Sequence, residues 1–329
     1  MTRRWIFNVL ASLALVFVAS SANAQTNWDQ SKMVGPDKCG ECHKTSVEVW
    51  KGTHHYNTFT DMPRSKEARE IASAMGIKRI KAESLCLDCH FTTVSNDPVA
   101  GISCESCHSP GKDWMKLHSS YSGKKKETES KQEAAARWAA SEKAGMLRPA
   151  NTYAIAKNCY NCHVVPQEAL VNKGGHAAGS PFELVSWSQG EVRHNVWWND
   201  GKGNREPDQN RLRMLFIIGQ AVELETSLRA VGEATVNDKY AVAMAQRAQA
   251  SAQRFAAIAG KINTPETKAI VAALGSVKLD LNQKASLNAS ADKIAAQAKA
   301  ISAKYDGSAF GAIDPFIPGK ANYKGKPAR

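Results

Sequence analysis

All eight cysteines of the chain fall into four copies of one motif, Cys-x-x-Cys-His, and none is left over. In this motif two thiols three positions apart can each add to one vinyl group of the same porphyrin, and the histidine that follows can bind its iron. The spacing therefore predicts four covalently bound haem c groups. The thioether cysteines would be Cys39, Cys42, Cys86, Cys89, Cys104, Cys107, Cys159 and Cys162. The proximal iron ligands would be His43, His90, His108 and His163.

Paired cysteines also occur in three other kinds of site. Zinc knuckles do not require a histidine directly after each pair. Thioredoxin-like redox sites belong to a βαβ pattern, which four copies here would have to repeat. Structural disulfides of an exported protein are the third alternative. We favour haem attachment because it alone accounts for the histidine that follows every pair.

Five further histidines lie close to the motifs in sequence. All nine histidines of the chain fall between residues 43 and 194, and the 135 residues after His194 contain neither histidine nor cysteine. Haem iron commonly takes a second imidazole as its distal ligand. Because the spare histidines share the region of the motifs, we predict four of them as distal ligands and His54 as the one without a haem. The predicted distal ligands are His55, His118, His176 and His194.

The first 24 residues have the pattern of a secretory signal peptide. A basic start, Arg3-Arg4, precedes an apolar run, and Ala22-Asn23-Ala24 forms a small-x-small cleavage site. We predict cleavage after Ala24 and a periplasmic location. A retained membrane anchor is the alternative, although the run is short for a transmembrane helix. No other run is long enough to cross a bilayer, so the mature chain is predicted to lack an integral membrane span.

The chain carries a formal net charge of +12, and removal of Arg3 and Arg4 leaves +10. Such a charge can indicate a nucleic-acid partner. Four haems would add eight propionates, however, and would bring the ferrous protein to about +2. We therefore predict no nucleic-acid binding, and other redox proteins as the partners that donate and accept electrons.

The sequence predicts a mainly α fold in two parts. A tetrahaem cytochrome c domain with little regular sheet would cover residues 25–200, followed by an antiparallel helical bundle at 201–308 and an extended tail at 309–329. Apolar residues recur three or four positions apart from Met214 to Val231 and again from Met244 to Ile262, as in amphipathic helices. Thr264-Pro265 has the pattern of a helix N-cap followed by proline. The Lys124–Lys143 stretch is polar and alanine-rich, which indicates a solvent-facing helix.

Residues 35–165 resemble the cytochrome c-554 family of tetrahaem electron carriers, which take electrons from hydroxylamine oxidoreductase in ammonia oxidisers. Trp50 and His55 follow the first haem histidine by seven and twelve residues, as a tryptophan and a distal histidine do in that family. The segment Gly101–Gly111 is similar to the family's Cys-Glu-Ser-Cys-His-Gly-Pro-Gly motif, and His118 matches another of its distal ligands.

The chain also departs from the family pattern. The family has a third distal histidine just before its fourth motif, at the position of Ala154 here. His176 or His194 would have to replace that ligand. The family also keeps one haem five-coordinate, whereas this chain has a spare histidine for each iron. The resemblance implies an electron carrier. The alternative is a haem enzyme that reduces a small nitrogen or sulfur oxide at a five-coordinate iron.

Overall fold

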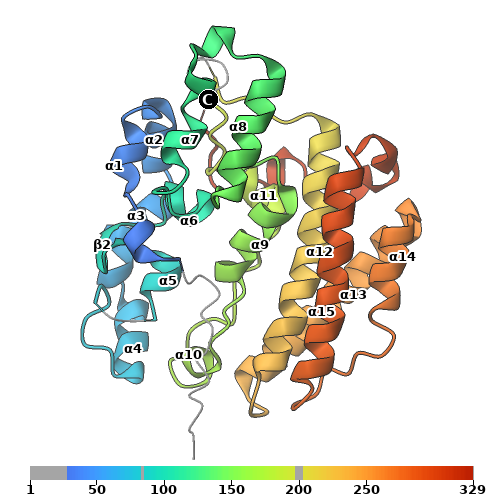
Figure 1. The fold of residues 1–329 in the computed structure, drawn as a ribbon. Helices are drawn as coiled ribbons and strands as arrows, with labels where there is room; N and C mark the ends of the chain where they lie inside the picture. The colour runs from blue at the N-terminus through green and yellow to red at the C-terminus, as the bar shows by residue number, and fades with distance from the viewer. Residues whose placement is uncertain (1–27, 83–84, 197–202, 329) are drawn as a thin grey trace, which may run out of the picture.

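The computed structural model describes residues 28–82, 85–196 and 203–328 (Figure 1). The predicted signal peptide, residues 1–24, lies outside these ranges. The described chain is mainly helical, with one two-stranded sheet, which confirms the predicted fold class. None of its helices is long and apolar enough to span a membrane.

The N-terminal part consists of short helices joined by loops. Its elements are η1 Gln30–Lys32, α1 Pro36–Gly40, α2 Lys44–Lys51, α3 His54–Asp61, η2 Met62–Arg64, α4 Lys66–Met75, α5 Leu87–His90, the strands β1 Thr92–Val94 and β2 Asp97–Ala100, α6 Cys104–His108 and α7 Met115–His118. The two strands pair antiparallel through a tight turn at Ser95-Asn96, where both residues have positive φ. Several of these short helices carry all or part of a haem motif, as α5 and α6 do, or a predicted distal histidine, as α3 and α7 do.

The middle of the chain connects this part to the bundle. It contains η3 Tyr121–Gly123, η4 Lys126–Thr128, α8 Lys131–Lys143, α9 Thr152–His163, α10 Glu168–Asn172 and α11 Leu184–Ser188. Helix α8 begins with a capping box, in which Ser130 and Glu133 satisfy each other's backbone N–H groups. The fourth haem motif forms the last turn and a half of α9.

The C-terminal part is a bundle of long helices. It contains α12 Gln209–Glu233, α13 Lys239–Ile262, α14 Pro265–Ala272 and α15 Lys284–Lys304. Thr264 caps α14 and Pro265 is its first residue, as the sequence predicts. Both α13 and α15 run antiparallel to α12, because each packs its N-terminal end near the C-terminal end of α12. The predicted apolar stripe of α12 is buried, and so are the residues between its members, apart from the half-buried Arg229.

Helix α12 is buried on all sides because α9 and α11 pack on it as well as α13 and α15. One continuous apolar cluster therefore runs from Tyr153 in α9 to Ile313, across the boundary that we expected near residue 200. The region from 309 also differs from the expected extended tail. It forms η6 Ser308–Phe316 and η7 Lys320–Asn322, and the backbone is extended at Ile317, Gly319 and Tyr323.

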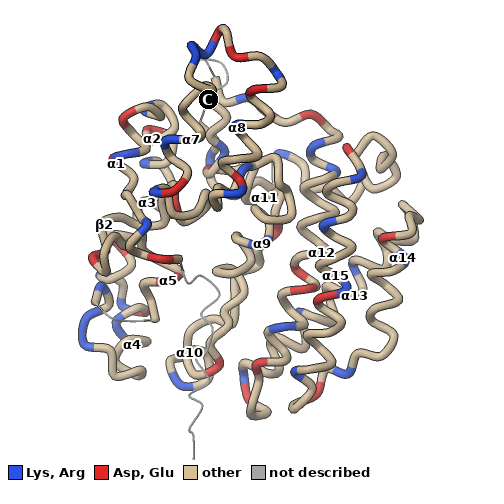
Figure 2. The backbone as a smooth tube through the Cα atoms, viewed as in Figure 1, with Lys and Arg blue, Asp and Glu red and all other residues tan. Residues whose placement is uncertain are grey.

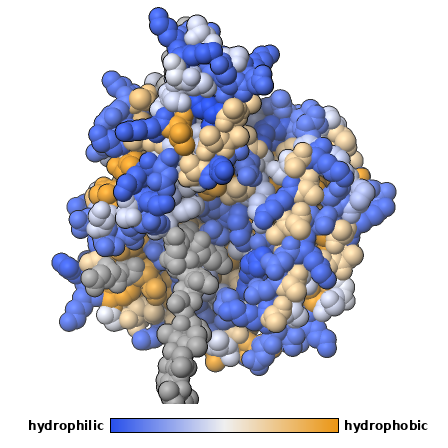
Figure 3. Space-filling view, in the orientation of Figure 1, coloured by the Kyte–Doolittle hydropathy of each residue, from blue (hydrophilic) through white to orange (hydrophobic). Residues whose placement is uncertain are grey.

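Charged residues of both signs are interspersed along both parts of the chain (Figure 2). The surface is mostly hydrophilic, and in the view of Figure 3 the most strongly apolar residues, in orange, gather mainly over the N-terminal part, at the left. Four large hydrophobic side chains of that part are more than a third exposed, namely Tyr56, Leu85, Val99 and Leu117. The N-terminal part thus leaves apolar surface that its own side chains do not cover.

Candidate haem sites

The structure places each predicted proximal histidine opposite one predicted distal histidine. The ring centroids of His43 and His118 lie 6.2 Å apart. The other three pairs have closely similar separations. They are His163 with His55 at 6.3 Å, His90 with His176 at 6.3 Å, and His108 with His194 at 6.1 Å. The eight predicted ligands thus form four pairs that share no member.

This separation has a simple meaning in coordination chemistry. A first-row metal ion lies about 2.0 Å from a bound imidazole nitrogen, and the ring centroid lies about 1.1 Å farther away. One iron between two imidazoles therefore places their centroids about 6.3 Å apart. The angles between the two ring planes range from 19° to 82°, which is compatible because each ring can rotate about the common axis. All four pairs fit one six-coordinate iron each.

Burial lowers the pKa of all four proximal imidazoles and so keeps them in the form that can bind a metal. It lowers the pKa of His90 and of His108 to about 4, with a smaller contribution from the facing histidine. Burial and the neighbouring His55 likewise lower the pKa of His163 to about 3. Rings with these pKa values are neutral at pH 7 and offer a free lone pair.

Hydrogen bonds at Nδ1 orient several of these rings. The Nδ1 of His118 lies 2.6 Å from the carbonyl of Met115, and that of His194 lies 2.7 Å from the carbonyl of Val192. His108, His163 and His176 have comparable contacts to Leu147, Ser180 and Ala177. A carbonyl can only accept, so Nδ1 carries the proton where it faces one and Nε2 is left for the iron.

The motifs themselves are adjacent in two pairs. The side chain of Cys39 lies within hydrogen-bonding reach of Cys104, which brings the first motif beside the third. The side chain of Cys89 lies within reach of Cys162, which brings the second motif beside the fourth. Residues 65 and 73 positions apart in the chain therefore meet through the fold.

Glu105, between the two cysteines of the third motif, fixes the first motif against the third. Its side chain is fully buried. One carboxylate oxygen accepts a hydrogen bond from the N–H of Gly35 at 2.7 Å, and the other accepts one from the N–H of Gly111 at 2.6 Å. The N–H of Val34 also donates to this carboxylate at 2.9 Å. The segment that leads into the first motif is thus bound to the third.

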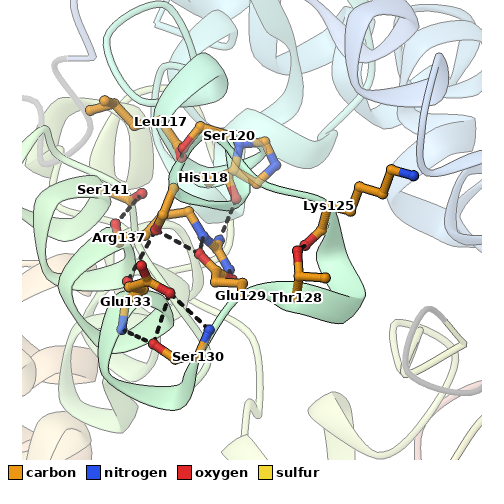
Figure 4. Close-up of polar contacts among 11 residues, drawn as sticks. Leu117, His118, Ser120, Lys125, Thr128, Glu129, Ser130, Glu133, Arg137 and Ser141 are labelled. Atoms are coloured by element: carbon orange, nitrogen blue, oxygen red, sulfur yellow. Dashed lines mark hydrogen bonds and ion pairs between the residues drawn. The ribbon is translucent and has the colours of Figure 1, made fainter.

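A buried ion pair holds the loop of His118 (Figure 4). The guanidinium of Arg137, on α8, donates two parallel hydrogen bonds of 2.6 Å to Glu129 and a third to the carbonyl of His118. Both side chains of the ion pair are more than nine-tenths buried. Helix α8 therefore does not simply face solvent, as we expected, because Arg137 points inward and fixes a predicted ligand.

Some buried donors near the pairs have no hydrogen-bond partner among the described residues. Among them are Nε1 of Trp187, whose ring lies 5.4 Å from that of His163, and Nε of Arg193, next to His194. A buried donor without a partner is costly, so these atoms call for an acceptor that the polypeptide does not supply. Each haem carries two propionates, which are acceptors of this kind. The described residues therefore fit haem in both ligand geometry and polar chemistry.

The histidine without a predicted haem, His54, has a different partner. Its Nδ1 lies 2.8 Å from a carboxylate oxygen of Glu191, and its ring is exposed.

The contacts of three residues were not apparent from the sequence, namely those of Glu105, Arg137 and Glu191. The only signal that could have suggested one of them is the glutamate inside the third motif, which the resembling family shares. Trp197 and Trp198, which could pack on a haem, lie outside the described residues.

Residues 38–109 match the model of the family described as cytochrome c554 and c-prime. Cytochrome c-554 of Nitrosomonas europaea is 27% identical over 160 residues, which cover 45% of this chain and 64% of that protein. The chain thus matches somewhat less than two thirds of the length of this relative. No solved structure matches the chain. Together, the two matches show that the part of the chain carrying the first three motifs is similar to the cytochrome c-554 family.

Proposed function

We propose that this protein is a periplasmic tetrahaem c-type cytochrome that carries electrons between redox proteins. One observation carries the proposal: four proximal histidines each face a second imidazole at 6.1 to 6.3 Å. The eight cysteines supply two thioether positions for each of four haems.

Haem iron, when bound, accepts and releases one electron. The chain contributes the second axial imidazole at each site, so that the coordination stays the same in both oxidation states and little rearrangement is needed. The low pKa of the buried rings keeps them neutral and available. Burial and the adjacent charges, such as Arg137 behind His118, would set the individual reduction potentials.

The pairing also bears on the alternative, a haem enzyme. Reduction of a small nitrogen or sulfur oxide requires an iron with an open position. His176 faces His90, so the second motif, too, has a distal candidate. This arrangement supports electron transfer over catalysis. The predicted signal peptide supports a location outside the cytoplasm, where c-type haem is attached in bacteria.

Iron analysis and spectroscopy of the purified holoprotein test the proposal. We expect four irons per chain, a ferric EPR spectrum with low-spin signals alone, and no carbon monoxide binding by the ferrous protein. His118→Ala should convert one iron of four to high spin. The exposed neighbour Leu117 provides the matched control, because Leu117→Ala should leave the spectrum unchanged. A high-spin iron in the unaltered protein would favour the enzyme, and fewer than four irons would contradict the tetrahaem assignment.

A further inference from the structure

The last described residues, 323–328, form a strap that lies across the segment carrying His194. The N–H of Glu191 donates to the carbonyl of Lys324, and the N–H of Lys324 donates to the carbonyl of Ser186, both at 2.9 Å. The Tyr323 side chain packs against the main apolar core. The strap is therefore hydrogen-bonded and anchored, although it contains no haem motif and no histidine.

The strap and the segment 186–191 approach each other so closely that only glycine fits at the point of contact in each of them. A Cβ on Gly190 would lie 1.9 Å from the carbonyl oxygen of Lys324. A Cβ on Gly325, whose φ is +67°, would lie 2.4 Å from a carboxylate oxygen of Glu191. Both contacts are far below a van der Waals distance, and the positive φ independently favours glycine. The strap thus has a tightly fitted seat on residues 186–191.

Asn204 connects the strap to both neighbours of His194. Its side-chain oxygen accepts from the N–H of Asn195 at 2.9 Å. Its side-chain nitrogen donates to the carbonyl of Arg193 at 2.6 Å and to that of Ala328 at 2.9 Å. The amide uses three of its four hydrogen-bonding positions on these contacts and is buried. The backbone on either side of the imidazole is therefore tied to one side chain, and through it to the strap.

Glu191 links the strap to a second distal histidine, His55. Its carboxylate accepts a hydrogen bond from the backbone N–H of His54 at 2.9 Å and contacts the ring of His54 at 2.8 Å. His54 is the first residue of α3 and directly precedes His55. Since the strap holds the backbone of Glu191, it also acts on the start of the helix that presents His55 to His163.

We propose that the strap, acting through Asn204 and Glu191, positions two distal ligands, His194 and His55, for the irons of the third and fourth motifs. The proposal rests on the proposed function, since it concerns how two of the four irons keep their second imidazole. The strap and these two residues act through hydrogen bonds to the backbone beside the histidines, so they are positioning residues.

The other two distal histidines limit what loss of the strap can do. Arg137 fixes the loop of His118, and His176 is held by the carbonyl of the next residue. Neither has a hydrogen bond to the strap among the described residues. Loss of the strap should therefore release at most two of the four imidazoles.

The test compares Gly190→Ala with Gly319→Ala in the four-haem holoprotein. An added Cβ at Gly319 would meet nothing within 4 Å, which makes this a matched control next to the strap. We expect Gly190→Ala to give a high-spin ferric signal from one or two irons and carbon monoxide binding in the ferrous state. Added imidazole should restore the low-spin spectrum. Truncation after Asn322 should have the same effect.

Asn204→Ala supplies an independent variant if the glycine substitution or the truncation prevents maturation. We expect one high-spin iron, and Asn322→Ala, at an exposed position, should give none. Low-spin spectra without carbon monoxide binding in both Gly190→Ala and Asn204→Ala would overturn the strap proposal and leave the proposed function intact. High-spin iron already present in the unaltered protein would instead contradict the proposed function.

Discussion

Residues 34–118 and residues 209–313 are both helical, but they bury their apolar surface differently. The N-terminal part has a small cluster of its own, with six buried members around Ile80 and Phe91. The bundle belongs to a far larger cluster, in which Ile217, Ile218 and Leu224 are fully buried.

This difference teaches what each part needs in order to fold. A core of side chains supplies the hydrophobic free energy that stabilises long helices. The N-terminal part has short helices and only a small cluster of buried apolar side chains, so we expect most of its burial to come from the porphyrins that the motifs would bind. We infer that the cofactor is part of the core on one side of the molecule and plays little part in the core on the other.

The largest effect is expected when haem attachment is prevented. In a variant with serine at all eight cysteines, the N-terminal part should lose its structure, while α12, α13 and α15 stay folded because they pack on one another through a large apolar core. Limited proteolysis with mass spectrometry should show early cleavage before residue 118 and late cleavage after residue 209. Equal resistance of both parts to the protease would contradict the inference that haem forms part of the core in the N-terminal part alone.

A smaller effect is expected from a cavity in the bundle. Phe255 is fully buried, so Phe255→Ala should lower the free energy of unfolding by about 3–5 kcal/mol. Chemical denaturation followed by circular dichroism measures this change, and the haem absorption spectrum should not move at all. Val242→Ala, on the exposed side of the same helix, should change the stability by less than about 0.5 kcal/mol. A shifted haem spectrum in Phe255→Ala would mean that the two parts are not separable in this way.

The smallest effect concerns acid stability at the edge of the bundle. Hydrogen bonds from Arg213 and Gln209 lower the pKa of Asp314 from 3.8 to about 2. The unfolded chain therefore binds the proton more tightly, and the stabilisation present above pH 3.8 is lost as the pH falls toward 2. Asp314→Asn should flatten the acid limb of a stability-against-pH curve in this window. An unchanged slope would show that the Arg213 contact is too exposed to matter.

Local patterns in the sequence predicted the haem motifs and most of the bundle. The apolar stripe from Met214 to Val231 and the Thr264-Pro265 start signal lie in helices where expected, because periodicity and capping are properties of neighbouring residues. The burial of Glu223 and Glu225 on α12 was not predicted. Both are paired with basic side chains from other helices or from the next turn, and such pairing depends on packing.

The pairing of histidines could not be read from the sequence for a related reason. His43 faces His118, 75 positions away, and nothing in the spacing selects it over His176 or His194. Arg137 likewise lies in a stretch of alanine, lysine and glutamate that has the composition of a solvated helix. Its inward position depends on Glu129 and on the loop of His118, which come together only in the folded chain.

Helix α9 belongs to both parts, and this has a consequence for how the protein is made. Its C-terminal end carries Cys159 and Cys162, while Tyr153 donates a hydrogen bond of 2.8 Å to the buried Glu225 of α12. Ala156 and Tyr160 of the same helix are completely enclosed. An enzyme that joins haem to the fourth motif needs access to both cysteines, and the docked helix leaves them only partly accessible. We therefore expect the fourth haem to be attached before α9 docks on α12.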